Sequence, residues 1–263
     1  MDRRRVTPGP ERRAPRLDLD DAIYGIHAVD EALAAGEVLR RIHVGDERKK
    51  DPALRSVFER AREAGIAVRF ENRGFFAAFP YKAHQSVVAF GAPFDYVTLD
   101  EAIALRPQTR PGLWVVLDHI TDPHNVGAII RTAVSAGVTA LILPERRSAG
   151  VNATVRKSAA GAAAYLPIAR VANIAQSVRT LKKARIWVAG AALSPAAVGY
   201  TTADFNVDLA IVIGAEGTGI SALVQRECDY LVSIPMEGKI ASLNASVAAG
   251  VLLYEALRQR RTG

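Results

Sequence analysis

From residue 113 onward the sequence alternates apolar runs with helical patterns, and this alternation limits the possible fold more than any other feature. Strands are predicted at residues 113–117, 140–143, 186–191, 209–213 and 230–234, and helices at 126–136, 151–160, 173–183, 221–227 and from 242. The first of these strands is apolar throughout, as in a strand buried on both faces. The pattern predicts an α/β fold with a parallel sheet that has helices on both sides.

The chain before residue 113 divides into three parts. Residues 1–18 hold six arginines and three prolines with few apolar side chains, which predicts a disordered basic tail. Such a tail can hold RNA phosphates, although a merely solvated tail is the alternative. Residues 19–95 are expected to form a small α/β domain of short helices and strands. Residues 96–112, with their prolines, are expected to link it to the domain at 113–263.

Charge, cysteine content and the length of apolar runs limit which partners, compartments and ligands are expected for this chain. The formal net charge of +7 favours a polyanionic partner, nucleic acid first and an anionic membrane surface second. Cys228 is the one cysteine, so an internal disulfide is excluded and a reducing cytoplasm fits. The sequence has neither an apolar run long enough to span a membrane nor an apolar secretory signal. The five histidines show no metal-ligand spacing, so no metal is expected.

Polar loops follow three of the predicted strands, where ligands of parallel sheets bind. The first, at residues 118–131, places Asn125 at the expected start of a helix and Arg131 among apolar helical neighbours. An unpaired buried guanidinium is costly, so Arg131 must reach a partner or the edge of a site. A structural ion pair is the alternative to a catalytic role.

The second loop contains three glycines, Gly214, Gly217 and Gly219, and one carboxylate, Glu216. Glycine permits close backbone approach and positive φ angles, which suits a loop that wraps a ligand. The loop lacks the G-x-G-x-x-G pattern and the Lys-Ser/Thr pair of phosphate-binding loops. It therefore argues against a nucleotide-dependent oxidoreductase.

The third loop runs from Ile234 to Asn244 and leads into the last helix. Ser242 is expected to cap that helix, because its hydroxyl can accept a bond from a free backbone N–H. Residues 243–257 are apolar nearly all round, which predicts burial on several sides. The polar first turn, with Ser242, Asn244 and Ser246, indicates either a ligand or ordinary capping.

Together the three loops resemble the motifs of the SpoU/TrmH branch of the SPOUT methyltransferases. The resemblance rests on Asn-x-Gly-x-x-x-Arg, Gly-x-Glu-Gly-x-Gly and Ile-Pro-Met-x-Gly…Ser-Leu-Asn-x-Ser, and covers residues 113–257. It implies methyl transfer from S-adenosylmethionine to a ribose 2′-OH of RNA. The front domain, with His84 and Gln85, looks like the ribosomal-protein-like RNA-binding domain of the ribosomal RNA guanosine 2′-O-methyltransferases, which usually carry glycine where this chain has Ser86.

The same resemblance implies the architecture of the site. It implies a deep trefoil knot at the C-terminus, and a homodimer in which the last helix and the helix of the first motif pack across the subunit boundary. The residues expected to hold the cofactor, largely through backbone groups, are Ala192, Leu193, Gly214, Ile234 and Leu243.

The residues implied for catalysis are Arg131, Asn125, Glu216, Ser242 and Asn244. Arg131 is the family's catalytic arginine, acting either as a base or as a cation that lowers the pKa of the hydroxyl. The amides and Glu216 would orient the ribose or Arg131, and Ser242 would complete the hydrogen-bond frame. Arg156 and Lys157 look like the family's basic helix near the RNA, with a solvated face as the alternative. His84 and Gln85 are expected either to contact RNA bases or to have structural roles.

The expected function is therefore ribose 2′-O-methylation of large-subunit ribosomal RNA, at a guanosine. A tRNA guanosine and a ribosomal adenosine are the alternative targets. A non-catalytic RNA-binding protein for ribosome assembly is the alternative from another class, and it predicts loss of residues such as Asn125 and Arg131.

Overall fold

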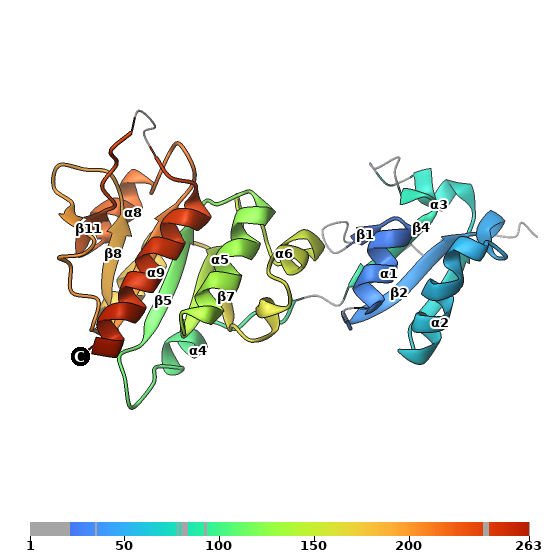
Figure 1. Cartoon of the computed structure of the whole chain (residues 1–263), viewed down its shortest axis with the longest axis horizontal. Helices are drawn as coiled ribbons and strands as arrows, with labels where there is room; N and C mark the ends of the chain where they lie inside the picture. Colours follow the sequence, from blue (N-terminus) through green and yellow to red (C-terminus); the bar gives the residue numbers. More distant parts are fainter. Residues whose placement is uncertain are drawn as a thin grey trace, which may run out of the picture. The chain divides into compact units, whose positions relative to one another are not determined.

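The computed structural model describes residues 22–34, 36–77, 79, 84–91, 94–238 and 242–262. They belong to two compact units, one up to Ala92 and one from Pro93 (Figure 1). The basic tail expected at residues 1–18 lies outside the described residues, and so do residues 239–241 of the third loop. Within the described ranges, no helix combines the length and the apolar character that crossing a membrane requires.

The first unit is a four-stranded sheet in the order β1-β4-β2-β3 with helices on its faces. Its elements are β1 (Ala22–Tyr24), α1 (Ile26–Ala34), β2 (Leu39–Gly45), α2 (Arg55–Glu63), β3 (Ala67–Glu71), α3 (Arg73–Ala77) and β4 (Val87–Gly91), with 3-10 turns at Asp46–Arg48 and Pro52–Leu54. β4 pairs antiparallel with β1 and β2, whereas β2 and β3 are parallel. Helices α1 and α2 pack together, and Phe76 and Phe79 form a second core with Val88 and Phe90.

The second unit is built on a seven-stranded sheet in the order β7-β6-β5-β10-β8-β11-β9. Its elements are α4 (Leu99–Ala104), β5 (Leu113–Asp118), α5 (Pro123–Ser135), β6 (Ala140–Pro144), α6 (Ala153–Ser158), β7 (Ile168–Val171), α7 (Ile174–Lys183), β8 (Trp187–Ala191), β9 (Val198–Gly199), β10 (Leu209–Gly214), α8 (Ala222–Glu227), β11 (Tyr230–Ser233) and α9 (Ala245–Thr262), with a 3-10 turn at Ala162–Ala164. Every strand pair in it is parallel, so the predicted parallel sheet is confirmed. The trefoil knot stays a prediction.

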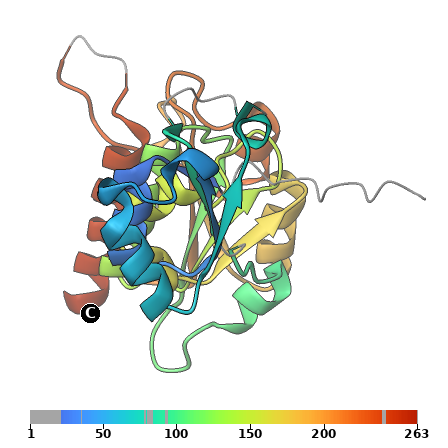
Figure 2. The same ribbon diagram turned by 90° about the vertical axis from the view of Figure 1, so that its right-hand side faces the viewer.

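The central strand β5 is buried on both faces, as its apolar sequence predicts. Leu113, Val115 and Leu117 face the core formed with α5 and α9. Trp114 and Val116 face the opposite core, which includes residues of α4 and α7. In the side view, α9 in red and α4 in light green accordingly lie on opposite sides of the sheet (Figure 2).

The segment expected as a linker, residues 96–112, packs on the second unit. Val97 forms a β-bridge with Ala169 of β7, and α4 contacts β6 and β7. Thr98 and Glu101 form a reciprocal capping box at the start of α4, which satisfies two backbone donors. The indole nitrogen of Trp114 also donates to the carbonyl of Ala102 (2.9 Å).

Two predicted helix starts are wrong. Helix α5 begins earlier than expected, because Asp122 is its cap and accepts from the backbone N–H of His124, so Asn125 lies inside the first turn. At α9 the cap is Asn244 and not Ser242. The Asn244 side-chain oxygen accepts from the backbone N–H groups of Ser246 (2.9 Å) and Val247 (3.3 Å).

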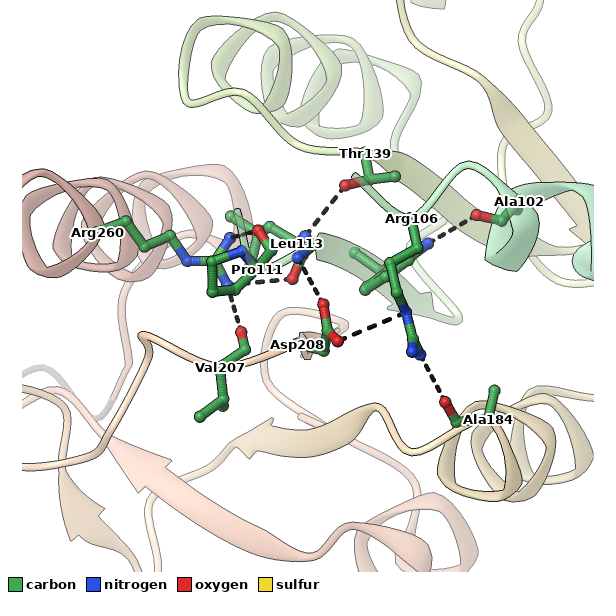
Figure 3. Close-up of polar contacts among 11 residues, drawn as sticks. Ala102, Arg106, Pro111, Leu113, Thr139, Ala184, Val207, Asp208 and Arg260 are labelled. Carbon is green, nitrogen blue, oxygen red and sulfur yellow. Dashed lines mark hydrogen bonds and ion pairs between the residues drawn. The ribbon is translucent and has the colours of Figure 1, made fainter. Parts of the chain in front are cut away.

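Arg260, near the end of α9, ties this helix to the amino ends of the two central strands. Its guanidinium donates to the carbonyls of Phe205, Pro111, Gly112 and Val207 at 2.8–3.2 Å. Close by, the Asp208 carboxylate accepts from the backbone N–H of Gly112 (2.6 Å) and pairs with Arg106 (Figure 3). Burial lowers the pKa of Arg260 to about 10, which is still far above neutral pH, so the side chain stays a cation.

We expect Arg260→Ala to lower the free energy of unfolding by roughly 2–3 kcal/mol, because a charged donor is lost and buried carbonyls lose their partner. Arg260→Lys should recover little, since an ammonium cannot reproduce the fork of donors. Urea unfolding followed by circular dichroism measures both effects. Arg261→Ala, at an exposed neighbouring position, is the control. Equal stability of the Arg260 and Arg261 variants would contradict this role.

Candidate active site

A cavity of about 390 Å³ lies at the carboxyl ends of β8, β10 and β11. Its lining is mainly small or apolar side chains together with the backbone of the glycine loop after β10. The five residues expected to hold the cofactor all line this cavity: Ala192, Leu193, Gly214, Ile234 and Leu243. The structure thus brings together three segments that are far apart in the sequence. The lining also includes Met236 of the third loop and Gln225, which the sequence analysis did not single out.

The glycine loop is packed so tightly that position 214 has no room for a side chain. A Cβ atom there would overlap the backbone of Gly219 and Ile220. The loop turns back on itself because the N–H of Gly219 donates to the carbonyl of Ala215 (2.8 Å). Gly217 and Gly219 have φ angles of 76° and 66°, which only glycine adopts without strain.

Asn125, Glu216 and Asn244 form one hydrogen-bonded network. The side-chain amide of Asn125 donates to Glu216 Oε1 (2.7 Å). The amide of Asn244 donates to the same carboxylate oxygen and to Asn125 Oδ1 (2.9 Å). Three of the five residues implied for catalysis are therefore in direct contact, each from a different sequence motif.

The network sits at the amino-terminal end of α9. Glu216 Oε1 also accepts from the backbone N–H of Ala245 (3.4 Å), at the first residue of the helix. Free N–H groups and the helix dipole favour a negative charge at this point. Glu216 also lines the cavity, so the network borders the space expected for the cofactor.

The other two residues implied for catalysis make no hydrogen bond to the three residues of the network. Ser242 is exposed and lines the cavity. Arg131 is exposed on α5, and its guanidinium makes no hydrogen bond or ion pair to a described residue. Arg131 was expected to reach either a partner or the edge of a site. Its side chain is exposed, so burial does not force it to find a partner, and its place at the edge of the site stays a prediction.

Asp118 is a residue whose role the sequence analysis missed. It ends β5, is fully buried, and its two carboxylate oxygens accept from the backbone N–H of Ser221 (2.7 Å) and contact His119 Nδ1 (2.5 Å). The bond to Ser221 fixes the far end of the glycine loop. A carboxylate as the last residue of an otherwise apolar strand was the available signal.

His84 and Gln85, expected either to contact RNA or to have structural roles, have structural partners within the first unit. His84 Nδ1 accepts from the backbone N–H of Ser86 (2.9 Å) and its ring stacks on Phe76. The Gln85 side chain accepts from the N–H of Ile26 (3.4 Å), and its carbonyl accepts from Arg48 (2.6 Å). A contact of these two residues with RNA stays a prediction.

Ser86 has a left-handed φ of 54°, a conformation that glycine adopts without strain. This explains in physical terms why glycine is usual at this place in the family that the sequence resembles. The backbone N–H of Glu47 is the largest cause of the lowered pKa of its carboxyl group, and the Ser86 side chain is the second. Glycine at position 86 would lack that side-chain effect on Glu47.

Arg156 and Lys157 lie on α6, which packs against α5. Gly127 permits this approach, because a Cβ there would overlap Ser158 and the carbonyl of Val155. Arg156 is half-buried with its guanidinium over the ring of Phe94 (6.0 Å), whereas Lys157 is exposed. Among the described residues, no group of three or more histidine, cysteine, aspartate or glutamate side chains has the arrangement of a metal site.

Comparison with known proteins agrees with this geometry. A family model described as the SpoU rRNA Methylase family matches residues 112–254. The chain belongs to this family. A second model, described as RNA 2′-O ribose methyltransferase substrate binding, matches residues 22–97. The expected family and enzyme class are thereby confirmed, and the first unit corresponds to a substrate-binding domain.

Relatives extend along nearly the whole chain. A putative TrmH family tRNA/rRNA methyltransferase, YacO of Bacillus subtilis, is 38% identical over 241 residues, covering 91% of this chain and 96% of its own. An uncharacterized tRNA/rRNA methyltransferase of Synechocystis is 40% identical, over 97% of this chain and 67% of its own. The SpoU methyltransferase AviRb of Streptomyces viridochromogenes, in complex with AdoMet, superimposes with a TM-score of 0.64 at 27% identity, covering 92% and 91% of the two chains. AdoMet is the cofactor that the sequence resemblance implied.

We expect Gly214→Ala to weaken binding of S-adenosylmethionine at least tenfold and to lower the melting temperature, because the new methyl group overlaps the backbone of the glycine loop. Calorimetric titration and thermal unfolding measure the two effects. Gly199→Ala is the matched control, since a Cβ there meets Thr202 at an ordinary 3.7 Å. Unchanged cofactor affinity in the Gly214 variant would show that the loop does not hold the cofactor.

Proposed function

We propose that this protein transfers a methyl group from S-adenosylmethionine to the ribose 2′-OH of a guanosine in large-subunit ribosomal RNA. The observation that carries the proposal is the cavity bordered by the Asn125–Glu216–Asn244 network. The cavity offers a place for the cofactor, and the network offers polar groups beside it for the ribose. The reaction class follows from the family, whereas the target nucleotide is proposed here.

The residues of the cavity fit S-adenosylmethionine. Apolar chains such as Leu193, Ile234 and Leu243 suit the faces of an adenine ring, and the tight backbone of the glycine loop brings polar main-chain groups close to a ligand. When bound, the sulfonium supplies an electrophilic methyl group. The residues of this chain then have to place the ribose oxygen in line with that methyl carbon and its sulfur.

The network is suited to orienting a ribose. Glu216 fixes the direction of both asparagine amides, so neither amide can flip without losing a bond to the carboxylate. In the reaction the ribose oxygen forms a bond to the methyl carbon, the bond from that carbon to sulfur breaks, and the hydroxyl proton is released. The amide of Asn125, which gives one of its two N–H groups to Glu216, and the nearby Ser242 hydroxyl keep the ribose oxygen in place during this exchange.

Arg131 is proposed to act as a cation rather than as a base. A guanidinium stays protonated under ordinary conditions, and an exposed one can approach the phosphate next to the target ribose. A positive charge beside the hydroxyl also lowers the pKa of that hydroxyl and so favours loss of its proton. The exposure of Arg131 leaves it available to RNA.

We propose ribosomal RNA as the substrate because a substrate-binding domain precedes the methyltransferase domain. The curated relatives carry the broader description tRNA/rRNA methyltransferase. Methylation of a tRNA guanosine or of a ribosomal adenosine is the alternative; the assay below distinguishes them by the RNA that carries the label and by the base at the alkali-resistant linkage.

We propose that the protein works as a homodimer through α5 and α9, which lie side by side (Figure 1). Val247 and Tyr254 are 50% and 52% exposed, and their spacing of seven residues places them on one face of α9. A second copy would remove these apolar side chains from water. A sedimentation measurement that finds only monomer at working concentrations would contradict the dimer.

The test of the function is transfer of labelled methyl groups to total RNA from cells that lack this enzyme. The expected result is a single alkali-resistant linkage in large-subunit ribosomal RNA. Label in tRNA would keep the reaction and overturn the substrate. Cofactor binding without transfer to any RNA would contradict the enzymatic proposal and favour a ribosome-assembly role.

In the same assay, Arg131→Ala is expected to reduce methyl transfer by at least a hundredfold while the affinity for S-adenosylmethionine stays within about twofold, because one preorganised charge contributes two to three orders of magnitude in rate. Arg131→Lys should recover part of the rate through its charge. Loss of cofactor binding in Arg131→Ala would contradict the role given to this residue.

A further inference from the structure

A second hollow, of about 290 Å³, lies at the amino-terminal end of β8, the strand that ends at the cofactor cavity. It is lined by Lys182, Arg185, Ile186, Trp187 and Asp229. Trp187 is 54% exposed, whereas Trp114, the other tryptophan of the chain, is fully buried. An exposed indole beside cationic side chains is typical of surfaces that bind unpaired nucleotides.

The backbone that presents the indole is held in place from several sides. Arg106 donates to the carbonyl of Ala184 (2.5 Å), a contact drawn in Figure 3. The N–H of Ile186 donates to the carbonyl of Leu181 (3.1 Å), and the N–H of Trp187 to that of Asp208 (2.9 Å). A ligand that stacks on Trp187 therefore meets a surface that needs little further ordering.

Arg185 occupies a conformation that costs stability. It follows the end of α7 with a φ of 61°, at the position where helices usually carry glycine or asparagine. Its side chain is exposed and makes no hydrogen bond or ion pair to a described residue. The described contacts of the folded chain therefore do not explain why an arginine stands there, whereas an anionic ligand would.

Two cationic side chains line the hollow, Lys182 and Arg185, and among the described residues only Lys182 has a carboxylate partner. Lys182 pairs with the Asp229 carboxylate (2.9 Å) and donates to the carbonyl of Glu227 (2.9 Å). The second oxygen of Asp229 accepts from the N–H of Val188 (2.9 Å). Since the carboxylate of the hollow is already satisfied, the charge left for a ligand is positive.

We propose that this hollow binds one unpaired nucleotide of the RNA substrate, with the base stacked on Trp187 and a phosphate on Arg185. The proposal rests on the proposed function, because it takes RNA as the substrate. Trp187 and Ala191, at the two ends of β8, are separated by about 13 Å along the strand. The hollow is thus an anchor for RNA away from the methyl-transfer site, and it positions substrate rather than taking part in the chemistry.

Tryptophan fluorescence tests the proposal directly in the full chain. Binding of a short single-stranded RNA of mixed sequence should quench the exposed Trp187 and shield it from iodide, while buried Trp114 contributes a constant signal. Trp187→Leu should remove the quenching and weaken RNA binding roughly fivefold or more, as expected for loss of a stacked base. It should leave the cofactor affinity unchanged.

Arg185→Gly removes the positive charge and keeps the left-handed backbone conformation, so it tests the role of the charge without disturbing the fold. Glycine suits the left-handed position, so the melting temperature should not fall. The plot of the logarithm of the RNA association constant against the logarithm of the salt concentration should become less steep by about 0.7, the value for one phosphate contact of a single strand. Arg226→Ala removes another exposed cation, on α8, and is the control in which the slope should stay unchanged.

The outcomes also separate this inference from the proposed function. Methyl transfer and RNA binding by the wild type without quenching of Trp187, or with equal affinity in Trp187→Leu, would overturn the nucleotide site and leave the function intact. Absence of any RNA binding or transfer by the wild type would instead contradict the proposed function. Quenching by anionic lipid vesicles and not by RNA would also overturn the proposal.

Discussion

The contact between Glu216 and the two asparagines is the interaction on which the site depends. It joins the first turn of α5, the glycine loop after β10 and the start of α9, which are separated by 91 and 28 residues. A single carboxylate oxygen accepts from both side-chain amides and from the backbone N–H of Ala245. Because the partners come from three segments, this contact fixes the position of the last helix relative to the cavity.

The carboxyl-terminal end of α9 is held by backbone carbonyls and not by a network of side chains. Arg260 is a half-buried cation held by four backbone carbonyls rather than by a carboxylate. Partial charges of several peptide groups replace water around the guanidinium, so the last helix is fixed at its far end too. Helix α9, whose first turn borders the cavity, is therefore held in position at both ends, by the bonds of Asn244 and by those of Arg260.

Much of this arrangement could be predicted from the sequence. Apolar strands followed by polar loops indicated a parallel sheet, and parallel strands carry their loops to one edge. Details that depend on side-chain competition could not be predicted. Asp122 and Asn244, not Asn125 and Ser242, cap the two helices, because several polar residues near each start can accept the same N–H groups. Strands β7 and β9 are too short, at four and two residues, to give a clear alternation.

The hydrogen-bond directions within the network have a consequence for how this sequence can change. The side-chain amide nitrogen of Asn244 donates to Glu216 and Asn125, and its side-chain oxygen accepts from the first N–H groups of α9. A change at any one of the three positions leaves donors or acceptors of the other two without partners. Across related sequences the three positions should therefore vary together or stay fixed together, although they lie in separate motifs.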